Sequence, residues 1–174
     1  MSRIYNTWAL MGASWDLLKK DKEILLFPLL SGISCILVML SFALPIFLSG
    51  GIPNESDVSS PLYYVVLFSF YFINYFVITF FNSAIIACAV IRMGGGDPTV
   101  ADGFRAAMQR LHLILGWAAV AATVGMILRI IEGRSQLLGK IVAGMLGLAW
   151  TMTSFLVIPI LVIEQKNPVD ALKL

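Results

Sequence analysis

Long apolar runs separated by short polar segments dominate the chain. Four of these runs approach or exceed the roughly 20 residues with which a helix crosses about 30 Å of hydrocarbon. They cover residues 24–49, 61–93, 113–131 and 141–164. Because a helix satisfies its own backbone hydrogen bonds in lipid, the pattern predicts an all-α, polytopic transmembrane helical bundle. We expect a single membrane domain over residues 1–174, with the four spans arranged as two hairpins.

Each predicted hairpin is preceded by a shorter segment with one apolar face. In residues 3–22, apolar side chains recur at spacings of four and three, which is the period of a helix. That face carries Ile4, Trp8, Met11, Trp15 and Leu18, and the expected interfacial anchors are Trp8, Trp15, Lys19, Lys20 and Lys22. Residues 98–112 place Val100, Phe104, Ala107, Met108 and Leu111 on one side. Both segments are predicted to be amphipathic helices that lie along the membrane surface.

A glycine-rich junction separates the second span from the second amphipathic segment. Gly94, Gly95 and Gly96 follow the span directly and are expected to end it. Asp97 is a suitable cap for the next helix, and Pro98 suits the first helical position. The glycines do not form a phosphate-binding loop, because the lysine and hydroxyl residue that end such a loop are missing.

The end of the chain repeats the arrangement at its middle. VIRMGGGDPTVADGF resembles VIEQKNPVDALKL, since in each an apolar helix ends near a charge and a proline opens an amphipathic segment. Asn167 is the corresponding cap, and residues 167–174 are expected to start a further amphipathic helix. The sequence stops within the first turns of this third unit. We therefore expect a truncated unit, with a natural ending at Leu174 as the alternative.

One side of the second span carries polar side chains within an otherwise apolar helix. They are Tyr71, Asn74, Tyr75, Thr79, Asn82 and Ser83. Exposed amides are costly in lipid, so this polar face is expected to point into the protein. Two interpretations stay open. The amides form hydrogen bonds between helices, which is their common use in membranes, or the face lines a path for a solute.

Small residues form stripes on the third and fourth spans. The third span has Ala118, Ala122 and Gly125, and the fourth has Ala143, Gly147 and Thr151. Small side chains allow helices to approach closely, so the fourth span is expected to pack against the third. The same faces are candidate contacts with a partner membrane protein or with a second copy of the chain.

A candidate ion pair stands at the end of the third span. Arg129 and Glu132 are three residues apart on one helix and are able to meet. The pair has three interpretations: a surface ion pair of little energetic consequence, an arginine that extends to lipid headgroups, or a group used in transport.

Composition agrees with a membrane protein and excludes several other classes. Hydrophobic residues make up 59% of the 174 residues and charged residues 13%, whereas soluble domains have about 25% charged residues. The net charge of +2 is too small to predict binding to nucleic acid. Cys35 and Cys88 lie in apolar runs and are expected to pack as small hydrophobes. With a single histidine, His112, we predict no metal site, and we predict no cofactor and no catalytic residue.

The distribution of basic residues predicts the orientation. Arginines and lysines are frequent before the first span, between the second and third spans and after the fourth. The turn at residues 50–60 has none, although the turn after the third span has some. Because basic loops stay in the cytoplasm, both ends of the chain and the glycine junction are predicted to be cytoplasmic in a multi-pass protein of the cell membrane.

Several segments carry a family resemblance. SWDLLKKDKEILLFPLLSG, FNSAIIACAVIRMGGGDPTVADGFRAA, ILGWAAVAATVGMILRIIE and NPVDALKL are similar to an uncharacterised family of bacterial and archaeal polytopic membrane proteins. The Gly-Gly-Asp-Pro junction is the most specific part of this resemblance. The resemblance implies a prokaryotic cytoplasmic membrane and usually six spans, and this chain departs from it by stopping earlier. A looser likeness, in architecture alone, is to the membrane domain attached to some glycerophosphodiester phosphodiesterases, and it implies no enzyme activity.

These observations favour a structural or accessory membrane protein that acts through helix packing. Small-residue stripes and interfacial helices support it, and charged residues inside the spans, which usually mark coupled transport, are scarce. The alternative is a small-solute transporter or channel with a polar path along the second span. An enzyme is not predicted, since no nucleophile stands with a plausible base and no paired carboxylates lie in a span.

Overall fold

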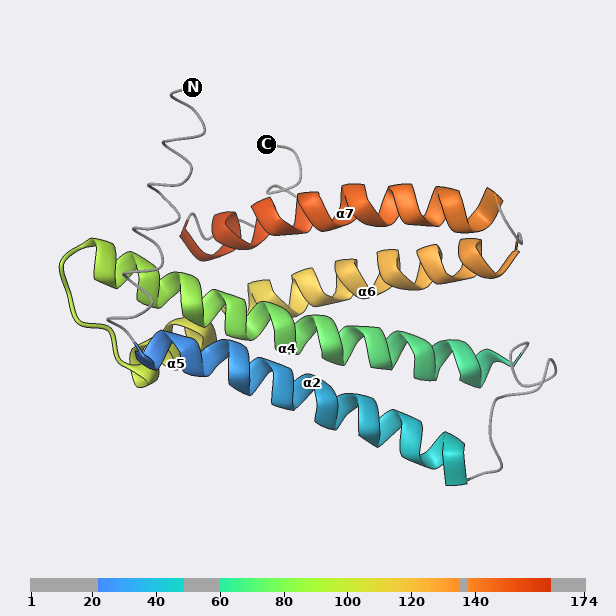
Figure 1. The fold of residues 1–174 in the computed structure, drawn as a ribbon, viewed down its shortest axis with the longest axis horizontal. Coiled ribbons are helices and arrows are strands. Elements are labelled where there is room, and N and C mark those ends of the chain that lie inside the picture. Colours follow the sequence, from blue (N-terminus) through green and yellow to red (C-terminus); the bar gives the residue numbers. More distant parts are fainter. Residues whose placement is uncertain (1–21, 49–59, 135–137, 164–174) are drawn as a thin grey trace.

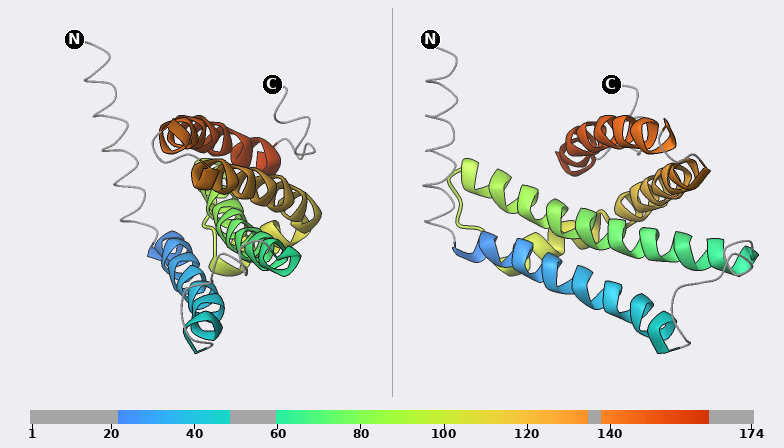
Figure 2. Two further views of the ribbon diagram at one scale, coloured as in Figure 1. Left: turned by 90° about the vertical axis from the view of Figure 1, so that its right-hand side faces the viewer. Right: turned by 45° about the vertical axis from the view of Figure 1, so that its right-hand side comes forward.

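The computed structural model of the chain describes residues 22–48, 60–134 and 138–163. In these residues the chain forms helices and no strand. The helices are α2 (Lys22–Leu48), α4 (Pro61–Met93), α5 (Val100–Gln109), α6 (Leu111–Arg134) and α7 (Leu138–Ile163). The four long helices lie side by side, with α4 and α6 in the middle (Figure 1). Both views in Figure 2 place α2 and α7 on opposite sides of the α4–α6 pair.

The four long helices have the length and composition of membrane spans. The apolar stretches are Ile24–Leu48, Pro61–Met93, Leu111–Glu132 and Ala143–Ile160. Their mean hydropathies are 2.4, 2.0, 2.0 and 1.6. Each stretch is long enough, or nearly so, to cross about 30 Å of hydrocarbon at 1.5 Å per residue. The chain is therefore an all-α membrane protein with four candidate spans.

The observed helices lie close to the predicted spans. Helix α4 coincides with the span predicted for residues 61–93, and α2 continues through Pro45 to Leu48. Helix α6 begins two residues before the predicted third span, and α7 begins three residues before the predicted fourth. The region predicted as one helix over residues 98–112 instead holds α5 and the first turn of α6.

Three predictions fall outside the described residues. They are the interfacial helix of residues 3–22 with its anchors Trp8, Trp15, Lys19 and Lys20, the helix start at residues 167–174, and the cap Asn167. Lys22, the remaining anchor, is the first residue of α2.

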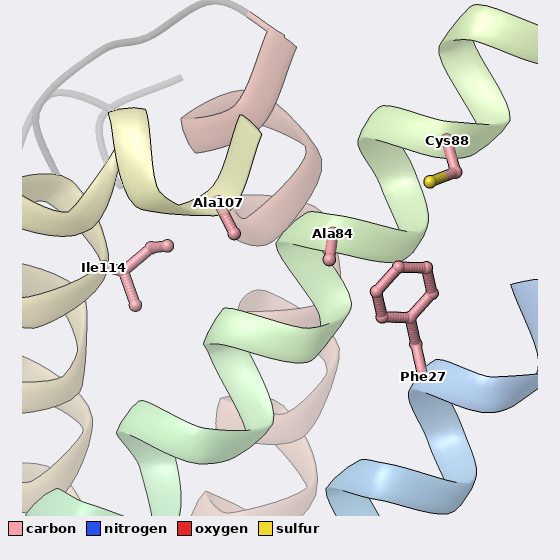
Figure 3. Packing of buried hydrophobic residues seen from close by; sticks show 5 residues of the cluster. All are labelled: Phe27, Ala84, Cys88, Ala107 and Ile114. Atoms are coloured by element: carbon pink, nitrogen blue, oxygen red, sulfur yellow. The ribbon is translucent and has the colours of Figure 1, made fainter. Parts of the chain in front are cut away.

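One hydrophobic cluster joins α2, α4, α5 and α6. Its buried members are Phe27, Ala84, Cys88, Ala107 and Ile114. Figure 3 shows the Phe27 ring pointing from α2 towards Ala84 and Cys88 of α4, with Ala107 of α5 on the other side of Ala84. Phenylalanines from α4 and α5 pack around this cluster, including Phe80 and Phe104, whose ring centroids are 5.8 Å apart.

A second cluster joins α6 to α7. Its buried members are Leu113, Trp117, Ala121 and Val157, with Tyr75 of α4 and Trp150 of α7 packed against them. The Trp117 and Trp150 rings stack at 5.4 Å with 15° between their planes. Helices α4 and α6 both contribute to both clusters, so the bundle is assembled on this central pair.

Candidate functional site

The polar face of α4 is partly buried. Thr79 and Ser83 are each 1% exposed, and Tyr71, Asn74, Tyr75 and Asn82 are intermediate. The Ser83 hydroxyl donates to the Thr79 carbonyl at 2.7 Å, and the Asn74 amide donates to the Phe70 carbonyl at 2.9 Å. Among the described residues the Asn82 side chain has no hydrogen-bond partner. The polar face therefore satisfies much of its hydrogen bonding within its own helix, and the described residues show no amide bridge between helices.

The small-residue stripe of α6 faces the two tyrosines of this polar face. Ala118 and Ala122 are fully buried. A Cβ added to Gly125 would lie 3.2 Å from Cε2 of Tyr75 and 3.3 Å from Cδ1 of Tyr71. The two tyrosine rings stack at 6.3 Å. The stripe of the third span is thus used for contact with α4.

The fourth span packs against the third as predicted, but not through Gly147 and Thr151 of its small-residue stripe. A Cβ added to Gly144 or Gly147 meets no atom within 4 Å. Thr151 is exposed, and its hydroxyl donates to the Gly147 carbonyl at 2.8 Å. Helix α7 does pack against α6, but through Trp150 and Val157. The stacked indoles offer more contact area than glycines, so they decide which side of α7 turns inward.

The glycine junction ends α4 as predicted. The Gly96 N–H donates to the Ile91 carbonyl and the Gly95 N–H to the Arg92 carbonyl, at 3.1 and 3.0 Å. This is the Schellman pattern, and Gly95 has the positive φ of 84° that it requires. The Arg92 guanidinium adds contacts with the Asp97 carboxylate at 3.0 Å and with the Gly96 carbonyl at 3.2 Å. The junction is therefore closed by both backbone and side-chain bonds.

The cap of α5 is Thr99, so the assignment of Asp97 as the cap was wrong. The Thr99 hydroxyl accepts from the Asp102 N–H, while the Asp102 carboxylate accepts from the Thr99 N–H at 3.1 Å. This reciprocal pair satisfies two free backbone groups, and Asp97 pairs with Arg92 instead. The Thr-x-x-Asp spacing in the sequence was the signal for it. Hydrogen bonds from the Thr99 hydroxyl and backbone, with nearby Arg105, lower the pKa of Asp102 below its usual value.

Helix α5 is held against the protein through Gly103, which sequence reasoning did not single out. A Cβ there would lie 2.5 Å from Cζ of Phe27, 2.8 Å from Sγ of Cys88 and 3.2 Å from the Ala84 carbonyl. Of the apolar side predicted for this helix, Val100, Phe104 and Ala107 pack into the cluster and Met108 is 58% exposed. Most of that side therefore faces α2 and α4. A lone glycine in a short helix gave no direct signal of this contact.

The predicted ion pair forms. Nη1 of Arg129 lies 3.1 Å from Oε2 of Glu132, with side chains 56% and 42% exposed. An exposed pair of this kind contributes little free energy, and it lies within one helix.

Comparison with known proteins gives a family. A family model described as "Family of unknown function (DUF6159)" matches residues 61–174, from the first residue of α4 to the end of the sequence. No curated protein and no solved structure gives a significant match. The match agrees with the uncharacterised family expected from the sequence.

Proposed function

We propose that this chain, which belongs to the DUF6159 family of unknown function, is a structural or accessory membrane protein that acts by packing α7 against another membrane protein helix. The outward face of α7 supports this proposal. Gly144 and Gly147 face open space. Around them lie exposed apolar side chains, of which Met145 is 68%, Leu148 66% and Met152 70% exposed.

Glycines are suited to this role because lipid tails are as apolar as the side chains, so the hydrophobic effect does not drive helices together in a membrane. Helices in lipid therefore associate mainly through close van der Waals packing, which small residues permit. The corresponding stripe on α6 shows this use within the chain, since Gly125 receives the rings of Tyr71 and Tyr75. By analogy, the α7 stripe suits a helix with bulky side chains.

The alternative, a solute path along the polar face of α4, has weaker support. Asn82 favours it, because the described residues give its amide no hydrogen-bond partner. Two contacts weigh against it. The Asn74 amide donates to its own helix, and Gly125 packs directly on Tyr71 and Tyr75. We therefore place helix packing ahead of transport.

The proposal is tested by the size of the complex in native lipid. The full chain is expressed in cells and extracted with a lipid-preserving polymer, and the mass of the particle's protein is compared with the 19.1 kDa of one chain. We expect a larger assembly. The double variant Gly144→Leu, Gly147→Leu should weaken it by about tenfold, which corresponds to about 1.4 kcal/mol.

Gly32→Leu is the matched control for this experiment. Gly32 lies on α2, and a Cβ there also meets no atom within 4 Å. The control should keep the assembly of the unchanged chain. A chain that is monomeric in native lipid, or a double variant that assembles as well as the control, contradicts the proposal.

A further inference from the structure

Arg110 stands at the corner between α5 and α6, where its own backbone bonds to both helices. Its N–H donates to the Ala107 carbonyl at 3.1 Å, and its carbonyl accepts from the Leu113 and Ile114 N–H groups, both at 3.0 Å. One residue thus ends α5 and caps the start of α6. Ala107 of α5 and Ile114 of α6 are buried in one cluster on the two sides of this corner (Figure 3). The Arg110 side chain therefore extends from a firmly held position.

The Arg110 guanidinium has no acidic partner within the described residues. Its Nη1 donates to the Ala106 carbonyl at 2.9 Å, and its Nε has no hydrogen-bond partner. The other arginines whose side chains the structure describes each lie near a carboxylate, at 3.0, 3.8 and 3.1 Å: Arg92 with Asp97, Arg105 with Asp102 and Arg129 with Glu132. A guanidinium is charged and offers five N–H donors. Arg110 therefore has a charge and donors for which this part of the chain supplies no anion.

The length of α6 places this corner at the depth of lipid headgroups. The apolar stretch of α6 runs from Leu111 to Glu132, and its 22 residues extend about 33 Å, which matches a hydrocarbon layer of about 30 Å. Because Leu111 opens this stretch, Arg110 lies just outside it. The polar face of α5 agrees with this depth, since the Arg105 side chain is 73% exposed and Gln109 is exposed as well. Such side chains are costly in hydrocarbon and stable beside phosphates and water.

The charges around the corner favour an anion. Residues 100–110 contain two arginines, Arg105 and Arg110, and one acidic residue, Asp102, so this segment is net positive. The Asp102 carboxylate is already engaged, because it accepts from the Thr99 N–H at 3.1 Å and from the Thr99 hydroxyl at 2.6 Å. Phosphate is the anion that phospholipids present at this depth, and a guanidinium is able to bind it through two parallel hydrogen bonds.

We propose that Arg110 binds the phosphate of an anionic phospholipid at the α5–α6 corner, with the exposed side chains of Gln109 and His112 as neighbouring donors. An anionic lipid is favoured over a zwitterionic one because its net negative charge complements the net positive segment. The bound lipid neutralises the guanidinium and holds the start of α6 at the membrane boundary. This site does not depend on the partner proposed for α7.

The first test counts the lipids bound to the full chain by native mass spectrometry from detergent. The probes are phosphatidylglycerol and phosphatidylcholine with the same acyl chains. The unchanged chain should bind one phosphatidylglycerol more tightly than phosphatidylcholine. Arg110→Gln should weaken this first binding by about tenfold, which corresponds to about 1.4 kcal/mol. Glutamine retains N–H donors and the backbone bonds of the corner, so the variant and the unchanged chain should have equal melting temperatures without added lipid.

Arg129→Gln is the matched control, because it removes the same charge from the exposed ion pair in the second half of α6. It should keep the first phosphatidylglycerol. Three results overturn the proposal. The two variants lose phosphatidylglycerol equally, which means a response to total charge. The unchanged chain binds the two lipids equally, which means no anionic-lipid site. Inorganic phosphate displaces the lipid, which means a site for a free anion.

A second measurement uses the unchanged chain and so does not depend on the folding of a variant. Phenylglyoxal modifies accessible guanidinium groups, and mass spectrometry of the peptides gives the rate at each arginine. Phosphatidylglycerol should slow the modification of Arg110 several-fold relative to phosphatidylcholine. Arg129, whose side chain is 56% exposed, is the internal reference and should react at the same rate with either lipid. Equal protection of the two arginines, or no protection of Arg110, contradicts the site.

Discussion

The two outer helices, α2 and α7, are held by the bundle in different ways. Both belong to hairpins of apolar helices, and both leave most of their apolar side chains exposed. Helix α2 is locked by α5, since Gly103 sits directly against Phe27. Helix α7 relies on the stacked rings of Trp117 and Trp150 and on Val157, and its glycine face is open. A similar sequence plan thus gives one hairpin locked by a short helix and one held by side-chain stacking alone.

This difference has a physical cause in the segment between the hairpins. Helix α5 has one helical face of apolar residues and one glycine small enough for a phenylalanine ring to approach its backbone. By packing against both α2 and α4, it fixes their relative position. Within the described residues, no comparable short helix packs against α7. Helix α7 of the second hairpin is therefore freer to contact a helix of another membrane protein.

The largest expected effect comes from breaking the closed hairpin. Gly103→Leu places a side chain where Phe27, Cys88 and the Ala84 carbonyl already lie, so overpacking should cost about 3 kcal/mol of unfolding free energy. The measurement is thermal unfolding of the purified full chain in detergent. Gly32→Leu is the control, since it adds the same side chain at an open position of α2. Equal melting temperatures for the two variants would refute the locking role of Gly103.

An effect of similar size is expected when the open hairpin loses its main contact. Trp117 is 1% exposed and stacks on Trp150. Trp117→Ala should lower the unfolding free energy by about 3 kcal/mol, because it leaves a cavity between α6 and α7. The matched variant Trp150→Phe keeps an aromatic ring and removes a buried N–H that has no partner, so it should change little. If Trp117→Ala and Trp150→Phe have the same melting temperature, the stacked rings do not hold α7 in place.

The smallest effects concern two arginines, Arg92 in the last turn of α4 and Arg129 in the second half of α6. Arg92 joins the end of α4 to Gly96 and Asp97, so Arg92→Ala should cost about 1 kcal/mol by loosening the junction before α5. Arg129 pairs with Glu132 on its own exposed helix surface, so Arg129→Ala should cost less than about 0.5 kcal/mol. Chemical unfolding of both variants in parallel checks the order. If Arg129→Ala loses more unfolding free energy than Arg92→Ala, the Arg129 side chain has a role between helices of the second hairpin.

Local sequence patterns determined the helices and much of the junction between them. The run from Pro61 to Met93 predicts a single long helix because apolar residues predominate and no glycine or internal proline interrupts it. Gly95 ends that helix because only the left-handed conformation allows the Schellman bonds, and glycine adopts it without strain. The exact cap was missed. Asp97 and Thr99 are both good caps by type, and the Thr-x-x-Asp spacing of a capping box, which only Thr99 has, was the signal that distinguished them.

The tertiary structure alone decided which faces meet. The sequence shows small residues on both α6 and α7, but it does not show that Gly125 receives two tyrosine rings while Gly147 receives none. It also shows an apolar side on α5 without showing that Phe27 and Cys88 lie against it. Helical periodicity and backbone hydrogen bonding act over a few residues and are readable along the chain. The packing of one helix face on another depends on side chains far apart in sequence, and in lipid, where every face is equally apolar, shape decides the outcome.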